Sequence, residues 1–263
     1  MELQQPLSKA IEAAKAAGDI IRQYAAHQNW GLIYKADGSP ATQADTDAEK
    51  AIRDIILTAF PDHSFTGEEF EPTNGNSDFR WYCDPIDGTW CLLNGEKTSS
   101  VSIALNKGEE TVLAVVYNPF TEELFTGAKG IPTSLNGVAL PRFKRTNPLD
   151  AVYNYQVAAA RRDNVLALYE IWSEDLIAKL VSRGGSIAYN LAQVAEGSHS
   201  AYIVASTKTP NLWDISAGVY LIKSIGGVVE ELGEGRTFMA SNNPIIHEKT
   251  LQFLKDVNFG KRG

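Results

Sequence analysis

The stretch that decides the fold and the chemistry runs Trp81-Tyr82-Cys83-Asp84-Pro85-Ile86-Asp87-Gly88-Thr89. It predicts an apolar strand that ends at Asp84, a proline turn that brings Asp87 back beside it, and a helix that starts near Gly88. Two carboxylates held this close share either a proton or a cation. Oxygen ligands suit a hard ion such as Mg²⁺, and backbone N–H groups at a helix start suit a phosphate. The stretch therefore predicts a site for a metal and a phosphate.

The composition is compatible with this prediction and excludes some partners. The chain has 263 residues, of which 44% are hydrophobic, and a formal net charge of −8. Binding to a nucleic-acid backbone relies on basic patches, so we expect no nucleic-acid partner. An acidic protein that acts on an anionic substrate needs cations at its site, and a bound metal supplies them. The two cysteines, Cys83 and Cys91, do not indicate a disulfide framework, and Cys83 is expected to be a buried thiol.

The expected cellular location follows from two kinds of segment that the sequence lacks. The first five residues have neither a basic region nor a long apolar run, which argues against a signal peptide. No stretch approaches the roughly 20 apolar residues that a membrane span requires. We therefore expect a soluble cytoplasmic protein with no membrane partner.

The first part of the chain predicts two amphipathic helices. Apolar residues recur with helical spacing over residues 7–25. After a polar loop, Thr42 and Asp45 have the spacing of a capping box and open a second helix that stops before Pro61. The preferred interpretation of Asp47 is a favourable interaction with the helix dipole, whereas the role of Asp45 is left open at this point.

A run of antiparallel strands is predicted next, with strands at residues 64–66, 101–105, 111–117 and 123–126 and a tight turn at Asn136-Gly137. Gly67-Glu68-Glu69 follows the first of these strands. Adjacent acids after a glycine are usually a solvated loop, but two neighbouring strands could aim Glu68 at the same point as Asp84 and Asp87. Both interpretations stay open on local pattern alone.

Residues 141–150 are polar and contain two prolines, so we place a boundary there between halves at 1–145 and 146–263. The second half is predicted to alternate strands at 152–157, 201–205 and 228–231 with helices at 165–172, 187–195, 214–225 and from Pro244 onward. Such alternation indicates an α/β half, and the whole chain is predicted to be α/β (α+β). Trp213-Asp214 opens one of these helices, and taken alone Asp214 is best interpreted as its N-cap.

Three motifs taken together, in this order, resemble the inositol monophosphatase family: Gly67-Glu68-Glu69, Asp84-Pro85-Ile86-Asp87-Gly88-Thr89 and Trp213-Asp214-Ile215-Ser216-Ala217-Gly218. This family comprises Mg²⁺-dependent, Li⁺-sensitive phosphomonoesterases, and the resemblance covers nearly the whole chain. It implies a layered αβαβα sandwich and a homodimer. It also implies that metal-activated water hydrolyses a small-molecule phosphate monoester.

The resemblance implies a role for each matching position. The metal ligands for two or three Mg²⁺ ions would be Glu68, Asp84, Asp87, Asp214 and the backbone carbonyl of Ile86, with Asp84 bridging two ions.

The remaining positions concern water and substrate. Glu69 and Thr89 would orient the attacking water, with Asp45 close to it and to a third metal position. Gly88 and Thr89 would bind phosphate through their N–H groups. The substrate-binding positions would be Lys35, where the family often has a loop lysine, together with Gly185, Ser186 and Lys208.

The sequence departs from the family pattern at two places. Trp90-Cys91-Leu92 replaces a variable residue, an asparagine and an aromatic residue, and Trp90 either lines the pocket or packs. Lys208 lies near the position where inositol-binding members have an acidic residue. It either meets a second anionic group of the substrate or points into solvent. This second departure weakens the case for inositol without affecting the metal chemistry.

Several activities fit this pattern. Inositol phosphate is the leading substrate by family resemblance, and the alternatives are fructose 1,6-bisphosphate, 3′-phosphoadenosine phosphate and histidinol phosphate. A non-catalytic metal- or ligand-binding relative would be expected to lack a ligand carboxylate, whereas all four are present. A serine hydrolase is disfavoured because no serine lies in a Gly-x-Ser-x-Gly elbow.

Overall fold

The computed structural model of the protein describes residues 2–27, 29–35, 38–141, 152–158, 179–182, 184–206, 209–232 and 237–256. The chain forms two compact units. The first comprises Met1–Ala139, Gly185–Tyr189 and Leu212–Leu221, and the second comprises Leu140–Gly184, Asn190–Asn211 and Ile222–Gly263. Nine of the ten residues around the expected boundary, 142–150, lie outside the described residues.

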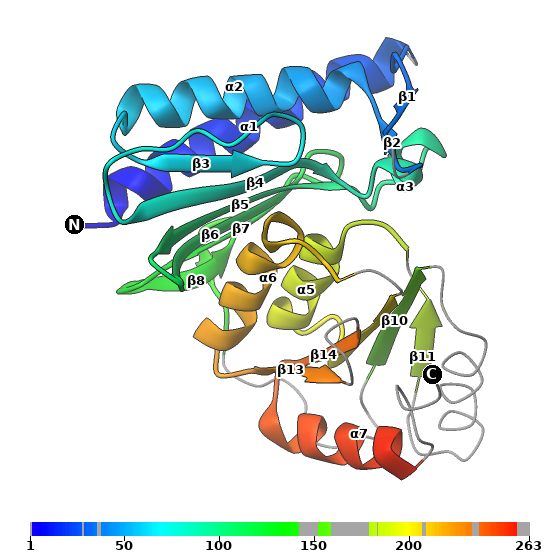
Figure 1. Cartoon of the computed structure of the whole chain (residues 1–263). Helices are drawn as coiled ribbons and strands as arrows, with labels where there is room; N and C mark the ends of the chain where they lie inside the picture. The colour runs from blue at the N-terminus through cyan, green and yellow to red at the C-terminus, as the bar shows by residue number, and fades with distance from the viewer. Residues whose placement is uncertain are drawn as a thin grey trace. The chain divides into compact units, whose positions relative to one another are not determined.

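The first unit is built on a seven-stranded sheet in the order β3-β4-β5-β6-β7-β8-β9. Two helices, α1 (Gln4–His27) and α2 (Gln43–Ala59), lie side by side on one face of this sheet (Figure 1). The strands are β3 (Ser64–Gly67), β4 (Phe79–Asp87), β5 (Ser100–Lys107), β6 (Glu110–Asn118), β7 (Glu123–Ala128), β8 (Ile131–Leu135) and β9 (Val138–Ala139). A separate two-stranded ladder joins β1 (Ile33–Tyr34) to β2 (Pro40–Ala41), and α3 spans Thr89–Leu93.

The two predicted helices are confirmed, and their packing follows from their sequences. The buried stripe of α1 consists largely of alanines, among them Ala10, Ala14 and Ala17, which allow the helix to approach the sheet closely. The predicted capping box of α2 is present, with the Thr42 and Asp45 side chains each bonded to the other residue's backbone. The predicted tight turn between β8 and β9 is also present.

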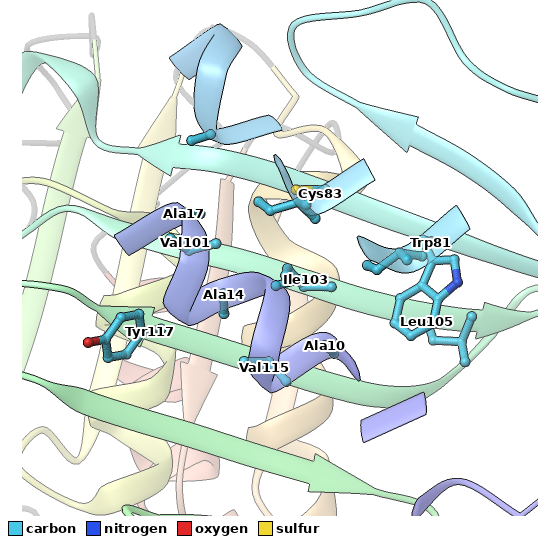
Figure 2. Close-up of a cluster of buried hydrophobic side chains, with 14 of the residues drawn as sticks. Ala10, Ala14, Ala17, Trp81, Cys83, Val101, Ile103, Leu105, Val115 and Tyr117 are labelled. Atoms are coloured by element: carbon cyan, nitrogen blue, oxygen red, sulfur yellow. The ribbon is translucent and has the colours of Figure 1, made fainter. Parts of the chain in front are cut away.

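Alternation along β5 separates the two faces of this sheet. Val101, Ile103 and Leu105 point into the apolar core beneath α1 and α2 (Figure 2). Ser100 and Ser102 are therefore directed to the opposite face, because successive side chains of a strand alternate. Both serines are fully buried. The sheet thus has one apolar face and, at this end, one polar buried face.

The predicted proline turn after Asp84 is wrong. Strand β4 continues through Pro85 to Asp87, and its pairing with β5 shifts between these two acids: Asp84 pairs with Ser102, and Asp87 pairs with Ser100. Two residues of β4 therefore oppose one of β5, which is the arrangement of a β-bulge. Acids three positions apart in a regular strand would point to opposite faces, but the extra residue places both on the face of Ser100 and Ser102.

The second unit has a five-stranded sheet in the order β11-β10-β12-β14-β13, in which β10 pairs in parallel with both β11 and β12. Its strands are β10 (Val152–Ala158), β11 (Lys179–Ser182), β12 (Ala201–Ser206), β13 (Val228–Leu232) and β14 (Thr237–Ser241), and its last helix is α7 (Pro244–Asp256). The division between the units falls inside α5 (Ile187–Glu196) and α6 (Leu212–Ser224). The helix predicted at 165–172 lies outside the described residues. Within the part of the chain that is described, no helix has the length and apolarity needed to cross a membrane.

Candidate active site

Three carboxylates from distant parts of the chain converge on the polar face of the first unit's sheet. Asp84 and Asp87 come from the bulge of β4, and Asp214 comes from α6. One oxygen of each lies within 4.8 Å of the others, and the two β4 acids are buried. A set of hard oxygen donors this close together, two of them buried, matches the ligand chemistry of Mg²⁺.

Helix α6 begins at Leu212, so Asp214 lies in its first turn and the N-cap interpretation is wrong. A carboxylate in the first turn is favoured by the helix dipole. The start of the helix is tied to the sheet because the Ser102 hydroxyl donates a 2.9 Å hydrogen bond to the Trp213 carbonyl oxygen. Ser102 also pairs with Asp84, so one residue links β4 and α6, the two elements that supply all three acids.

Asp87 is held by the start of α5. Its Oδ2 accepts hydrogen bonds from the Ser186 hydroxyl at 2.6 Å and from the Ala188 N–H at 2.7 Å. The same serine oxygen accepts from the Tyr189 N–H at 2.8 Å, so Ser186 caps α5 while it orients Asp87. Its hydroxyl also lies 2.7 Å from that of Ser100. In this structure the side chain of Ser186 is thus engaged with a site carboxylate.

Backbones approach closely where the bulge ends. Gly88 has φ +89°, and a Cβ there would lie 2.7 Å from the Ser186 nitrogen. We expect Gly88→Ala to lower the free energy of unfolding by at least about 2 kcal/mol, because it combines left-handed strain with a clash against backbone. Gly95→Ala is the matched control, since Gly95 has φ +77° and nothing lies within 4 Å of its would-be Cβ. Urea unfolding should show a clearly smaller loss for the control, and equal losses would contradict the close approach.

The acids repel one another in the absence of a cation. Burial raises the pKa of Asp84 well above its ordinary value, and neighbouring carboxylates, led by Glu68, raise it further. Burial also raises the pKa of Asp87, followed by the charge of Asp214, although the hydrogen bonds from α5 oppose the rise. A divalent cation would remove this repulsion, so the donor set fits a metal ion electrostatically as well as chemically.

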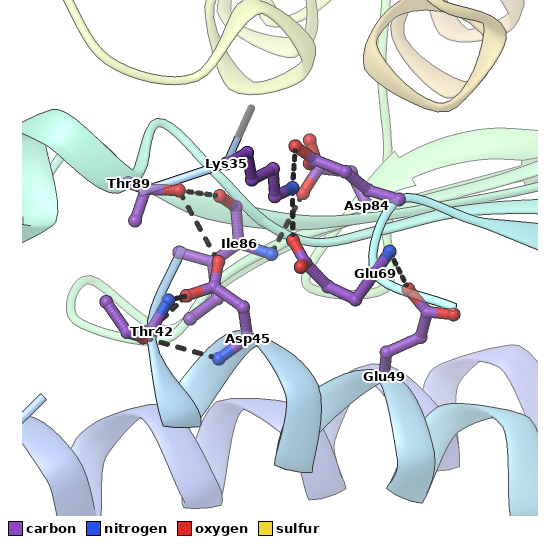
Figure 3. Close-up of polar contacts among 9 residues, drawn as sticks. Lys35, Thr42, Asp45, Glu49, Glu69, Asp84, Ile86 and Thr89 are labelled. Carbon is purple, nitrogen blue, oxygen red and sulfur yellow. Dashed lines mark hydrogen bonds and ion pairs between the residues drawn. The ribbon is translucent and has the colours of Figure 1, made fainter. Parts of the chain in front are cut away.

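Glu68 and Glu69 are joined by Lys35, whose Nζ lies 2.7 Å from a carboxylate oxygen of each. Figure 3 shows Lys35 beside Glu69. Burial lowers the pKa of Lys35, but the two carboxylates outweigh it, so the net shift is upward and the ammonium stays charged. Burial raises the pKa of Glu69 to about 7 despite this partner. Among the described residues Glu68 is outside the three-acid group, although it is the carboxylate that most strongly raises the pKa of Asp84.

Asp45 meets the end of the bulge through Thr89. The Thr89 hydroxyl lies 3.1 Å from the Ile86 carbonyl oxygen and 3.4 Å from Asp45 Oδ1 (Figure 3). Burial raises the pKa of Asp45 to about 6, against the hydrogen bonds from Thr42. The capping box therefore does more than start α2, because it directs a buried carboxylate toward Thr89.

The other predicted positions are placed as follows. Gly185 precedes the α5 cap, and a Cβ there would lie 2.4 Å from the Thr98 hydroxyl oxygen. Lys208 lies outside the described residues. Trp90 is 54% exposed, and its ring centroid lies 6.3 Å from that of Tyr34. The Trp90 ring therefore lies beside the Tyr34 ring and remains accessible to solvent. Cys83 is fully buried as expected, and burial raises its thiol pKa.

One buried acid at this end of the sheet was not predicted. Glu49 of α2 is 0% exposed and contacts the backbone of Glu69. The sequence contained one indication of this burial: Glu49 lies beside the apolar helix positions Ala48 and Ile52, where a solvated glutamate is not expected.

Comparisons of sequence and of structure both find related known proteins. The profile of the inositol monophosphatase family matches residues 2–258. A "Fructose-1,6-bisphosphatase/inositol-1-monophosphatase" of Aquifex aeolicus is 32% identical, over 95% of this chain and 96% of its own. A "Nus factor SuhB" of Pasteurella multocida is 30% identical, over 90% and 89% respectively. The crystal structure of the extragenic suppressor protein suhB of Bartonella henselae, 27% identical, superposes with a TM-score of 0.85 over 96% of this chain and 99% of that one. This likeness confirms the predicted layered α/β fold.

Proposed function

Because the chain belongs to the inositol monophosphatase family, we propose that it is a Mg²⁺-dependent phosphomonoesterase that hydrolyses a small-molecule phosphate monoester with water. The observation that supports this proposal most directly is the meeting of Asp84, Asp87 and Asp214 within 4.8 Å. These acids come from two elements more than 120 residues apart, and no fold requirement explains why three mutually repelling carboxylates should gather. A cation-binding role explains it.

Each residue then has a defined task. Asp84, Asp87, Asp214 and Glu68, with the Ile86 carbonyl, would hold two or three Mg²⁺ ions. When bound, such ions neutralise the ester, provide a reactive water at neutral pH and stabilise the leaving oxygen.

The protein groups around the metals position the reactants. Thr89, placed between Asp45 and the Ile86 carbonyl, would orient the water together with Glu69, whose raised pKa suits it to accept a proton.

The N–H groups of Gly88 and Thr89 would hold phosphate oxygens, as the resemblance implies. Lys35, Gly185, Ser186 and Lys208 remain proposed contacts to the rest of the substrate.

A phosphate-release panel with purified protein and Mg²⁺ tests this proposal. The panel contains inositol 1-phosphate, fructose 1,6-bisphosphate, 3′-phosphoadenosine phosphate and histidinol phosphate. We expect release from at least one ester, no release with EDTA, and inhibition by Li⁺ if it displaces one Mg²⁺. Cation binding by calorimetry with no release from any ester would instead support a non-catalytic relative. Full activity in high Li⁺ would contradict the leaving-group metal site but not metal catalysis.

The relatives carry two kinds of name, since proteins of similar identity are called inositol monophosphatase and "Nus factor SuhB". The carboxylate group favours the enzymatic role for this chain. A homodimer, which the family resemblance supports, and a cytoplasmic location are further parts of the proposal. Sedimentation of the purified protein at several concentrations would test the dimer.

A further inference from the structure

Residues 67–73, which we call the acidic loop, are held by two residues of α2 that the proposed chemistry does not use. Oε2 of Glu49 accepts a 2.7 Å hydrogen bond from the backbone N–H of Glu69 (Figure 3). Its Oε1 accepts a 2.8 Å hydrogen bond from Arg53, one helical turn further on. The Glu49 side chain is completely buried, so its carboxylate faces the acidic loop without contact with water.

Arg53 fastens the far end of the same loop. Its Nη1 donates a 2.7 Å hydrogen bond to the Thr73 hydroxyl, and its guanidinium carbon lies 4.6 Å from the centre of the Phe65 ring. Phe65 and Thr73 close the loop by exchanging two 2.8 Å backbone hydrogen bonds. The acidic loop is therefore attached to α2 at Glu69 and again at Thr73.

At Gly67 the backbone approaches Glu49 so closely that a side chain there would displace the carboxylate. A Cβ on Gly67 would lie 2.2 Å from Oε1 of Glu49 and 2.4 Å from Oε2. The carboxylate thus lies directly against the start of the acidic loop as well as under Glu69. One buried side chain therefore meets the backbone on both sides of Glu68, by close approach at Gly67 and by a hydrogen bond at Glu69.

Stability alone is a poor explanation for this arrangement. Desolvating an ion pair costs about as much as its attraction returns, and packed hydrophobic residues often replace such a pair without loss. What an apolar residue cannot supply is an acceptor for the Glu69 N–H. We propose that Glu49 is a positioning residue that fixes the direction in which Glu68 and Glu69 present their carboxylates to the metal ions and the attacking water. This inference rests on the proposed function, because it assigns Glu49 to that site.

Two substitutions at one position test the role. Glu49→Leu removes the acceptor at similar length, whereas Glu49→Gln keeps an amide oxygen that can accept from Glu69. We expect Glu49→Leu to weaken Mg²⁺ binding in calorimetry, and to lower kcat, each by about tenfold or more, as losses of outer partners of metal ligands do. Glu49→Gln should stay within about threefold of wild type in both. Asp54→Asn, at an exposed position of the same helix, is the charge control and should change neither.

A merely structural role gives a different pattern. In that case both Glu49 variants would lower the melting temperature, while folded protein kept wild-type Mg²⁺ affinity and kcat. A folded Glu49→Leu protein within about twofold of wild type in both quantities would overturn the proposal.

If Glu49→Leu does not fold, amide hydrogen exchange in the wild-type protein still tests the hydrogen bond on which the proposal depends. The Glu69 amide should exchange at least about tenfold more slowly than in an unstructured peptide, and exchange at the peptide rate would overturn the proposal. Neither exchange nor Mg²⁺ titration depends on turnover. Failure of every ester in the panel would therefore refute the phosphatase and leave these two readouts to decide on Glu49.

Discussion

Asp84→Asn is expected to lower kcat by about three orders of magnitude and, at the same time, to raise the melting temperature of the metal-free protein. The loss of activity follows because one ligand charge is removed from a centre that supplies several kcal/mol to the transition state, and about 4 kcal/mol corresponds to a thousandfold. The gain in stability follows because Asp84 is buried among carboxylates that raise its pKa well above the ordinary value. A neutral amide of the same shape relieves that repulsion.

The opposite signs of these two effects make the test specific. A substitution that simply damages the fold lowers both activity and melting temperature, whereas removal of a buried functional charge separates them. Phosphate release at saturating Mg²⁺ and thermal unfolding in EDTA measure the two effects on the same preparation. Asp54→Asn, exposed on α2, is the matched control and should leave both unchanged.

Asp87→Asn offers an independent check of the ligand assignment. It is also expected to lower activity by orders of magnitude with the fold intact, because an amide oxygen can still accept from Ser186 and Ala188. Near-normal turnover in either aspartate variant would show that these carboxylates are not ligands. An unchanged or lower melting temperature for metal-free Asp84→Asn would contradict the repulsion itself.

Local pattern predicted much of the first unit because its signals are local. The periodicity of α1 and the Thr42–Asp45 capping box depend on residues within one or two helical turns of each other. The bulge of β4 does not. Pro85 is a typical turn residue, and what keeps the strand extended is its pairing with Ser100 and Ser102, which lie across the sheet. Register with a partner strand depends on residues elsewhere in the chain, so the nine residues around the proline could not predict it.

The candidate site divides in the same way. Asp84 and Asp87 could be predicted as site residues from their own stretch of sequence. Asp214 could be explained locally as a helix cap, and only the family resemblance predicted that it is a metal ligand. The contact of Lys35 with two glutamates joins segments more than 30 residues apart. Glu49 was missed for the complementary reason, since a glutamate on a helix is ordinary until its burial is known. Convergence and burial are both tertiary properties, and sequence spacing alone carries neither.

The metal-free protein is expected to lose stability as the pH rises from 6 to 8, and saturating Mg²⁺ should remove this dependence. Buried acids bind protons more tightly in the folded than in the unfolded chain when their folded pKa is raised. Their contribution is complete below the ordinary values near 4, and it is lost as the pH passes about 6 for Asp45 and about 7 for Glu69. Asp84 and Asp87 are shifted in the same direction.

Mg²⁺ requires ionised ligands, so its affinity should increase over the same pH range in which the metal-free fold weakens. Thermal unfolding in EDTA should show a decrease of roughly 5 °C or more between pH 6 and pH 8, given that about 1 kcal/mol moves the melting temperature by a few degrees in a chain of this size. The Asp84→Asn protein should show a shallower decrease, because one of the titrating acids is gone. A flat or rising melting temperature in EDTA would mean that the fold already compensates these carboxylates, and the electrostatic argument for a cation at this site would then fail.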